Sequence, residues 1–320
     1  MSDGAPPDVP LRHRIEYAAF RGARAVVSAM PEGLAVRFGA LLGLLAGSVL
    51  RVRRATVLEN LTIAFPEETP KWRRRIARRS YVHLGREAVF LMRMKRWPAE
   101  RITERIRFDG VDEVRVEAER DEGVVVLSAH FGNWEIAGAG AAALGFPLDV
   151  VGKGMTNRLF EEDVFETRER LRMRVIEMSD APRAVLRSLG QGRIVAMLSD
   201  QNAHRWGVFI PFFGRLAATP RGAALFTIRR GTPTFVGLAA REPGWAQRYR
   251  LELRRLEYPT TGDPDADTVA LLTAYHRVLE EAIRADPEQY FWQHKRWKTR
   301  PPEEQAARGQ VRISQSQTSA

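Results

Sequence analysis

The pattern of apolar and polar residues changes at about residue 98. Before that point, long amphipathic or apolar stretches end at prolines, which stop helices. A polar, proline-rich leader over residues 1–10 comes first, and we expect it to be flexible. Residues 11–98 are then predicted to form a helical region. Its expected helices are Ile15–Met30, Leu34–Leu50, Arg54–Phe65 and Lys71–Lys95.

After residue 98, short apolar runs alternate with amphipathic stretches, which predicts an α/β domain over residues 99–302 with a mixed sheet flanked by helices. The polar tail over residues 303–320 is expected to be disordered. The expected strands are Val124–Leu127, Leu148–Val151, Val175–Met178, Ile194–Leu198, Thr234–Ala239 and Tyr249–Leu256. The expected helices are Gly132–Leu144, Asn157–Arg172, Ala181–Leu189, Pro220–Arg230 and Thr268–Asp286.

The run Val124–Leu127 is the most informative of these elements. It is continuously apolar, as expected for a strand buried on both faces. The strand should end at Ser128, and His130 follows at its carboxyl end. The helix after it should have Gly132 or Asn133 near its N-cap. Ligands of open α/β sheets bind beyond the carboxyl ends of the strands, so His130 lies at a candidate active site.

The spacing between His130 and Glu135 is compatible with a catalytic pair. On one continuous helix these side chains would point about 140° apart, so a contact requires His130 to precede the helix that carries Glu135. A carboxylate bonded to one ring nitrogen would fix the tautomer and leave the other nitrogen as a general base. The alternative is a histidine at a helix start and an unrelated surface glutamate.

Composition narrows the classes of partner. The chain has a formal net charge of +11, which favours an acidic partner such as an anionic lipid, an acidic carrier protein or nucleic acid. It contains no cysteine, which excludes a thiol nucleophile, a disulfide and a thiolate metal site. There is also no P-loop, no well-placed dinucleotide-binding glycine motif and no His-Glu-x-x-His helix, so nucleotide and zinc chemistry are not expected.

A membrane-associating segment is expected near the amino terminus. The segment Leu34–Leu50 is the most apolar of the chain but shorter than the ~20 residues that a membrane helix needs. Arginines at positions 51, 53 and 54 follow at once. This pattern favours a monotopic anchor, or a short tilted insertion, whose arginines reach anionic headgroups. A buried pair of helices is the alternative. No secretory signal peptide is recognised in residues 1–10.

The segment His130-Phe131-Gly132-Asn133-Trp134-Glu135 resembles the His-x4-acid motif of glycerolipid-type acyltransferases. In this form it is similar to the late acyltransferases of lipid A biosynthesis, the lauroyl/myristoyl transferase family. Further segments resemble that family in the same order along the chain, over roughly residues 11–302. They are Asn60-Leu61, Ala64–Glu67, Asp200-Gln201, Gly207–Gly214, Ala218-Thr219, Arg221-Gly222, Pro287–Trp292, His294 and Lys298–Pro301.

The resemblance implies an O-acyltransferase with a glycerolipid-acyltransferase-like fold, which attaches a fatty acyl group to a hydroxyl of a lipid A precursor. The expected acyl donor is the acylated acyl carrier protein (acyl-ACP), which acts as a co-substrate. No metal or other cofactor is expected, and nucleic acid is not an expected partner. The expected location is the cytoplasmic face of the inner membrane. One alternative is another glycolipid or a lysophospholipid as acceptor, and another is a non-catalytic basic protein that coats anionic membrane or nucleic acid.

Six residues are the candidate site residues. His130 is the expected general base, Glu135 its orienting acid, and Lys153 a cation for the oxyanion, where the family usually has an arginine. The N–H groups of Gly132 and Asn133 are candidates to supply or share the oxyanion role. The alternative for Lys153 is a solvated lysine on a glycine loop. Arg170, Asp200 and Gln201 are expected to bind substrate, although Asp200-Gln201 also fits an Asx turn.

Two further segments have an open interpretation. The apolar segment Phe209–Phe213 is either core or the groove for an acyl chain. The segment Trp292–Lys298, which includes His294, combines basic and aromatic side chains that suit a membrane interface or a phosphate. The remaining histidines at positions 13, 83, 204 and 276 have no motif context and are expected to be incidental.

Overall fold

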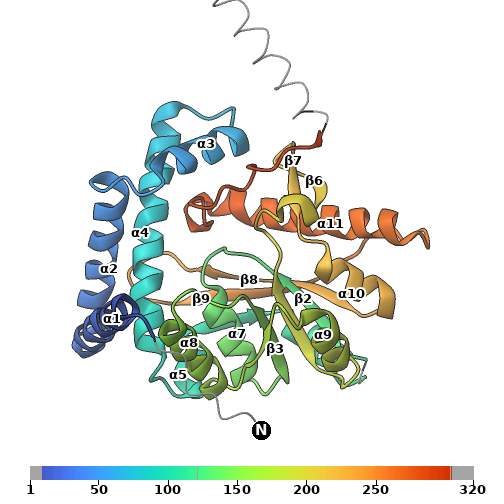
Figure 1. The fold of residues 1–320 in the computed structure, drawn as a ribbon, viewed down its shortest axis with the longest axis horizontal. Coiled ribbons are helices and arrows are strands. Elements are labelled where there is room, and N and C mark those ends of the chain that lie inside the picture. Colours follow the sequence, from blue (N-terminus) through green and yellow to red (C-terminus); the bar gives the residue numbers. More distant parts are fainter. Residues whose placement is uncertain (1–8, 121, 303, 305–320) are drawn as a thin grey trace, which may run out of the picture.

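The computed structural model describes residues 9–120, 122–302 and 304. A central sheet has helices on both faces, and the helical layer α1–α4 stands along one side of it (Figure 1). The described strands are β1 (Ile106–Asp109), β2 (Val124–Ser128), β3 (Leu148–Gly152), β4 (Arg174–Glu177), β5 (Ile194–Leu198), β6 (Val208–Phe212), β7 (Arg215–Thr219), β8 (Thr234–Arg241) and β9 (Tyr249–Arg255).

The helices include every one predicted from the sequence, with ends shifted by a few residues. The short helices α5 and α6 and two turns of 3-10 helix are additional. The α-helices are α1 (Leu11–Ala29), α2 (Glu32–Ser48), α3 (Arg54–Ala64), α4 (Pro70–Met94), α5 (Ala99–Thr103), α6 (Val111–Ala118), α7 (Trp134–Ala143), α8 (Arg158–Arg170), α9 (Ala181–Leu189), α10 (Gly222–Arg230) and α11 (Pro264–Ala285).

The main sheet has the strand order β1-β9-β8-β2-β5-β3-β4. Neighbouring strands are parallel except for β8 and β9, which run antiparallel, so the prediction of a mixed sheet is confirmed. The central strand β2 lies between β5 and β8. The carboxyl ends of β2 and β5 therefore meet at one edge of the sheet.

Two apolar layers cover the two faces of the sheet. Alternate residues of β2 divide between them: Val125 and Leu127 pack in the layer that contains α11, whereas Val124 and Val126 pack in the layer that contains α7. All five residues of β2 are buried, as the continuous apolar run predicted. The hairpin β6–β7 packs beside α11 and adds Phe212 and Phe213 to the first layer. The prediction of core packing for this segment is confirmed for these two phenylalanines.

Helix α2 packs unusually closely on α4, because glycines replace side chains at the contact. A Cβ atom added at Gly43 would lie 1.9 Å from the carbonyl oxygen of Tyr81, and one added at Gly85 would lie 2.1 Å from the carbonyl oxygen of Gly39. The opposite side of α2 is open, with Leu41 and Leu42 exposed by 50% and 44%. The segment is therefore half buried against α4 and half exposed as an apolar surface.

No helix in the described ranges combines the length and the apolar character that crossing a membrane requires. Attachment of the helical region to a membrane surface stays a prediction. The domain limits also stay predictions. The leader that is expected to be flexible and the tail over residues 303–320 that is expected to be disordered lie almost entirely outside the described residues.

Candidate active site

The register of two parallel strands brings His130 and Asp200 together. Ser128 of β2 is the register partner of Leu198 of β5, and each candidate residue lies two positions beyond its strand's partner residue. The distance between His130 Nδ1 and Asp200 Oδ1 is 2.8 Å. Because an ionised carboxylate can only accept a hydrogen bond, Nδ1 carries the proton and donates a hydrogen bond to Asp200. The other nitrogen, Nε2, is then unprotonated and lies 3.2 Å from the side-chain nitrogen of Gln201.

The contact with Asp200 makes the imidazole of His130 more basic. Burial lowers the pKa of His130, but the charge of Asp200 and its hydrogen bond outweigh burial, with a smaller contribution from the charge of Glu135, so the pKa is raised from its ordinary value. Burial raises the pKa of Asp200, and the charge and hydrogen bond of His130 outweigh it, so Asp200 is held ionised. A raised pKa makes His130 a stronger proton acceptor.

The structure corrects the orienting partner predicted for His130. His130 precedes α7 and Glu135 lies in its first turn, as expected. However, Glu135 binds Arg168 of α8 through both carboxylate oxygens, with a distance of 3.1 Å from Nε to Oε2. The two ring nitrogens of His130 face Asp200 and Gln201 instead. The correct pairing depends on a contact between two strands, which the local spacing of the motif does not reveal.

Two other predicted site residues lie away from the imidazole. Lys153 is exposed on the loop between β3 and α8, and no ion pair to it is found among the described residues. Arg170 is exposed at the end of α8, where its side chain donates to the carbonyl oxygen of Trp97 at 3.4 Å. The structure does not bring either residue to His130, so their roles stay predictions.

The predicted backbone oxyanion donors already have partners. The N–H of Gly132 donates to the carbonyl oxygen of Gln289 at 3.0 Å, and the N–H of Asn133 donates to that of Ala239 at 2.9 Å. The expectation that these two N–H groups receive the oxyanion is therefore wrong for this conformation. Their bonds instead fix the loop that follows His130 to the end of β8 and to the carboxyl-terminal segment.

Buried polar groups that had no recognisable signal in the sequence bind the loop between His130 and α7. The side chain of Asn133 accepts from the N–H of Ile136, which caps α7, and donates to Glu87 Oε2 of α4 at 2.8 Å. The hydroxyl of Tyr249 donates to the same oxygen at 2.6 Å. His83 is buried, with its pKa lowered to about 3, and its Nε2 lies 3.2 Å from the carbonyl oxygen of Gly132. His83 is thus part of the support rather than incidental.

The buried residues of the carboxyl-terminal segment have structural roles, while the two lysines of Trp292–Lys298 are exposed. Arg296 is 1% exposed and donates to the carbonyl oxygen of Ala218 at 2.7 Å. His294 accepts from the N–H of Asn202 at 3.0 Å, and burial lowers its pKa to about 4, so its ring is neutral. Neither side chain is therefore available as a cation for a phosphate. Asn60 of α3 fixes this segment by donating to the carbonyl oxygens of Trp292 and His294.

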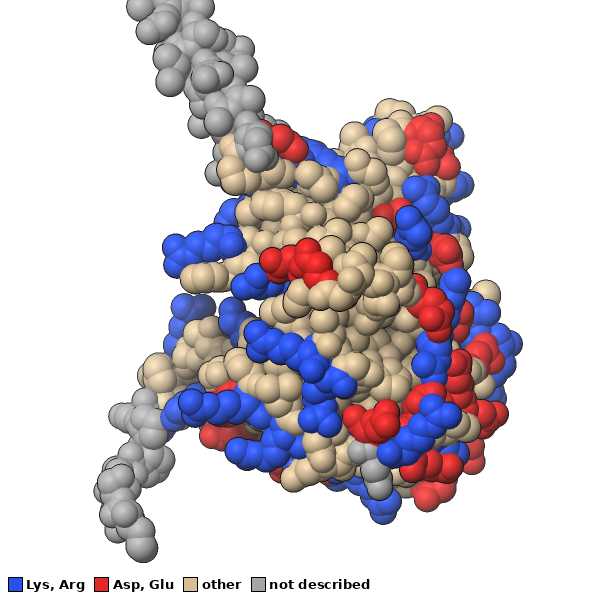
Figure 2. All heavy atoms as spheres, turned by 90° about the vertical axis from the view of Figure 1, so that its right-hand side faces the viewer, with Lys and Arg blue, Asp and Glu red and all other residues tan. Residues whose placement is uncertain are grey.

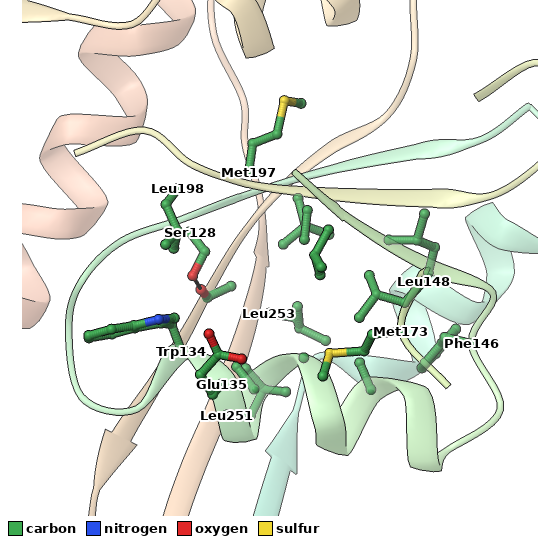
Figure 3. A pocket seen from close by; sticks show the side chains of 18 of the residues that line it. Ser128, Trp134, Glu135, Phe146, Leu148, Met173, Met197, Leu198, Leu251 and Leu253 are labelled. Atoms are coloured by element: carbon green, nitrogen blue, oxygen red, sulfur yellow. Dashed lines mark hydrogen bonds between the residues drawn. The ribbon is translucent and has the colours of Figure 1, made fainter. Parts of the chain in front are cut away.

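An apolar pocket opens beside His130. The ring of His130 packs against Trp134, with 4.9 Å between the ring centroids, and Trp134 lines the pocket. Glu135 and Ser128 lie at one end, and Phe146, Leu148 and Met173 lie at the other (Figure 3). The pocket runs between α7 and the face of the sheet, so it can enclose an alkyl chain that starts near the imidazole. The apolar residues can be read from the sequence, but the pocket cannot, because it depends on how the strands and the helix pack.

The fixed loop predicts a large effect for Gly132→Ala. Gly132 has φ +58°, and an added Cβ would lie 1.9 Å from the carbonyl oxygen of Ala239. We expect the free energy of unfolding to fall by about 3 kcal/mol or more, because strain and a steric clash add. Gly145→Ala is the matched control, since Gly145 has φ +89° with open space around it, and should cost about 1 kcal/mol. Equal losses in urea denaturation would contradict the prediction.

The chain is similar in sequence to known acyltransferases. Residues 8–299 match the model of a family described as bacterial lipid A biosynthesis acyltransferase. A lipid A biosynthesis lauroyltransferase of Escherichia coli is 27% identical over 281 residues, which cover 86% of this chain and 89% of that protein. A phosphatidylinositol mannoside acyltransferase of Mycolicibacterium smegmatis is 26% identical over 82% of this chain and 86% of its own length.

Proposed function

Since this chain belongs to the bacterial lipid A biosynthesis acyltransferase family, we propose that it transfers a fatty acyl group from acyl-ACP to a hydroxyl group of a lipid A precursor. The observation that carries the proposal is the juxtaposition of a base and an apolar pocket. His130 holds an unprotonated Nε2 through its bond to Asp200, and the pocket lined by Trp134 and Phe146 begins beside it. This arrangement suits a hydroxyl acceptor and an alkyl chain.

The proposed reaction is a direct transfer in a ternary complex. His130 Nε2 removes the proton of the acceptor hydroxyl as its oxygen attacks the thioester carbonyl carbon. The resulting tetrahedral intermediate collapses as the carbon–sulfur bond breaks, and the imidazolium gives the proton to the departing thiolate. An ester and a free thiol are the products. The side-chain amide of Gln201, 3.2 Å from Nε2, must give way when the hydroxyl binds.

Other residues have supporting roles in this proposal. Asp200 holds the tautomer and stabilises the imidazolium, while Glu135 adds negative charge near the imidazole and is itself fixed by Arg168. Lys153 remains the proposed cation for the oxyanion, and Arg170 a proposed contact for acceptor phosphate. No group of three or more potential metal ligands is found in the described part of the chain, and the proposed chemistry uses no metal.

The proposed partners follow from surface properties. On the face drawn in Figure 2, the left side carries Lys and Arg with few acidic residues, whereas Lys and Arg are mixed with Asp and Glu on the right side. Such a basic side suits an acidic carrier protein or acceptor phosphates. We also propose that the exposed apolar side of α2 attaches the protein to the cytoplasmic face of the inner membrane, because Leu41, Leu42 and Leu45 are each exposed by more than 40%.

The experiment that tests this function offers purified protein one donor and several acceptors. With acyl-ACP, we expect mass spectrometry to show one added acyl group on a disaccharide lipid A precursor. Parallel reactions use a phosphatidylinositol mannoside and a lysophospholipid, because one relative is a phosphatidylinositol mannoside acyltransferase. Transfer to another glycolipid alone would favour that second candidate function, and transfer only from acyl-CoA would overturn the proposed donor.

The role of Lys153 has its own test. If Lys153 meets the oxyanion, Lys153→Ala should lower kcat about a hundredfold with less effect on KM, since the charge appears on that oxygen only in the transition state. Lys153→Arg should be milder because it keeps the charge. Steady-state kinetics of both variants measure this. A change in kcat within about twofold for both would assign the oxyanion to another donor, and a change in KM alone would assign Lys153 to substrate docking.

A further inference from the structure

A second cavity, remote in sequence from the His130 motif, is lined by cations. It lies between the end of α2, the start of α3 and the first turns of α4, on the side of the molecule that α2 and α4 form in Figure 1. Gly47, Leu58 and Tyr81 are among its uncharged lining residues. We call it the arginine pocket, after the cations that surround it: Arg54, Lys71, Arg74, Arg75 and Arg78.

Two neighbouring arginines of α4 have bonded partners, whereas the side chains of the pocket cations have no hydrogen-bond or ion-pair partner among the described residues. Arg73 donates to the carbonyl oxygens of Phe65, Pro66 and Glu68, and Arg79 lies 3.9 Å from a carboxylate oxygen of Glu288. No ion pair to the pocket cations is found among the described residues, and no acidic residue lines the cavity. Side chains on the same helix are therefore divided between those used in the fold and those directed at an open cavity.

This arrangement is electrostatically unfavourable without an anion. Arg74 and Arg78, and likewise Lys71 and Arg75, are four residues apart on one helix, a spacing at which like charges repel. They also lie near the amino terminus of α4, where the helix dipole favours negative charge, and the first turn of α4 has no acidic residue. Helix α3 begins beside them at Arg54 without a side-chain cap. A bound anion would offset both the repulsion between the cations and the lack of negative charge at the two helix starts.

The surface beside the pocket indicates which anion. Gly47 and Ser48 line the pocket, and an apolar strip of three nearby residues is exposed: Leu45 by 41%, Val49 by 66% and Leu50 by 71%. A glycerophospholipid combines a phosphate with acyl chains, so one molecule can occupy the pocket and cover this strip together. A soluble acidic protein would supply carboxylates but would leave the strip exposed.

We propose that the arginine pocket binds the phosphate group of an anionic glycerophospholipid and so fixes how the protein lies on a bilayer. The guanidinium groups of Arg74, Arg75 and Arg78 form charge-assisted hydrogen bonds to the phosphate oxygens. The apolar strip contacts the upper part of the acyl chains. This inference rests on the proposed attachment of α2 to a membrane but not on the proposed acyl transfer.

The test compares the binding of the full chain to two kinds of vesicle, phosphatidylcholine alone and phosphatidylcholine with phosphatidylglycerol. The variant Arg74→Ala/Arg75→Ala/Arg78→Ala should lose about a hundredfold in binding to the anionic vesicles, since each basic residue at such a surface contributes roughly fivefold. The matched control removes three exposed arginines from α9 and α10, Arg183→Ala/Arg187→Ala/Arg229→Ala, and should lose about twofold or less. Equal losses in the two variants would overturn the pocket in favour of diffuse attraction.

A second measurement reports on the pocket without a bilayer. Dihexanoyl phosphatidylglycerol, kept below its micellar concentration, should raise the thermal unfolding midpoint of the wild type and of the control but not that of the pocket variant. A rise in all three proteins, or in none, would overturn the proposal. The same scans establish that the pocket variant is folded.

Two further outcomes separate this proposal from other roles of the same surface. Leu41→Gln/Leu42→Gln, which leaves the apolar strip intact, should lose binding to both kinds of vesicle yet keep the response to dihexanoyl phosphatidylglycerol, and unchanged vesicle binding would overturn the membrane attachment itself. The pocket variant should keep kcat on detergent-dispersed substrates. Loss of binding to acyl carrier protein, with vesicle binding intact, would assign the pocket to the carrier and overturn the lipid proposal.

Discussion

His130→Ala should lower kcat for acyl transfer about a thousandfold while the protein stays folded, because it removes the group proposed to take the acceptor proton. The loss should be larger for kcat than for binding, since His130 lies beside the pocket mouth without lining the pocket. Initial rates with acyl-ACP and saturating acceptor measure this effect. The control is His204→Ala, which alters an exposed histidine a few residues beyond Asp200 and should change kcat by no more than about twofold. Turnover of His130→Ala within tenfold of the wild type would exclude the proposed base.

The pH dependence of kcat/KM should carry the signature of the same residue. Asp200 raises the pKa of His130, so the imidazole stays protonated, and inactive as a base, to a higher pH than an ordinary histidine. The rate should therefore rise with pH through a pKa above 6.5, and fall as pH is lowered through it.

Asp200→Asn should have an effect of similar size, about a thousandfold in kcat. The structure places Asp200 as the buried partner of His130 rather than as the substrate contact predicted from the sequence. An amide at position 200 can donate to Nδ1, which moves the ring proton to Nε2 and leaves no lone pair for the acceptor hydroxyl. Burial then dominates the pKa of His130, so the acid limb of the residual activity should shift to lower pH. This shift distinguishes a positioning role from simple loss of structure.

The control for Asp200→Asn is a substitution at the other acid beside the imidazole. Glu135→Gln removes a charge that contributes less to the pKa of His130, and no bond between the two side chains occurs in the structure. We expect a smaller loss of kcat and a smaller shift of the acid limb. If Glu135→Gln moves the acid limb more than Asp200→Asn, the two carboxylates have the opposite roles from those proposed.

The two strands that precede His130 and Asp200 could be predicted from the sequence, but their adjacency in the sheet could not. The strands β2 and β5 are continuous apolar runs, so both His130 and Asp200 could be placed at carboxyl ends of strands. That β5, rather than β3, lies next to β2 is a property of the whole sheet and has no local signal. For this reason the near neighbour in sequence, Glu135, was predicted as the partner in place of Asp200.

The missed elements lack the usual local signals for a different reason. The hairpin β6–β7 turns through Phe213 and Gly214, which both have positive φ (49° and 70°). Such turns normally have asparagine or aspartate before the glycine, so a phenylalanine there hides the hairpin. The edge strand β1 alternates Ile106 and Phe108 with charged residues over only four positions, too short a pattern to separate from a loop.

The membrane-associating segment shows the limit of hydropathy as a signal. The segment around α2 is apolar for two reasons that a linear sequence does not separate. Its glycines at positions 39, 43 and 47 permit close contact with α4, and its leucines at positions 41, 42 and 45 are exposed. Glycines at a helix contact and leucines at an exposed surface give the same apolar run in the sequence. Only the structure shows that one side of α2 is covered by α4.

The pairing of His130 with Asp200 through strand register has a consequence for how such an enzyme can change during evolution. The two side chains owe their separation to the buried ladder between β2 and β5, since each lies two residues beyond its strand, and among the described residues the loop after β3 makes no bond to either. Insertions or substitutions in the loop after β3 can therefore reshape the acceptor side of the site while the proton-transfer pair stays in place. Acceptor preference and catalytic competence are separable traits in this architecture, which is consistent with relatives named for two different glycolipids.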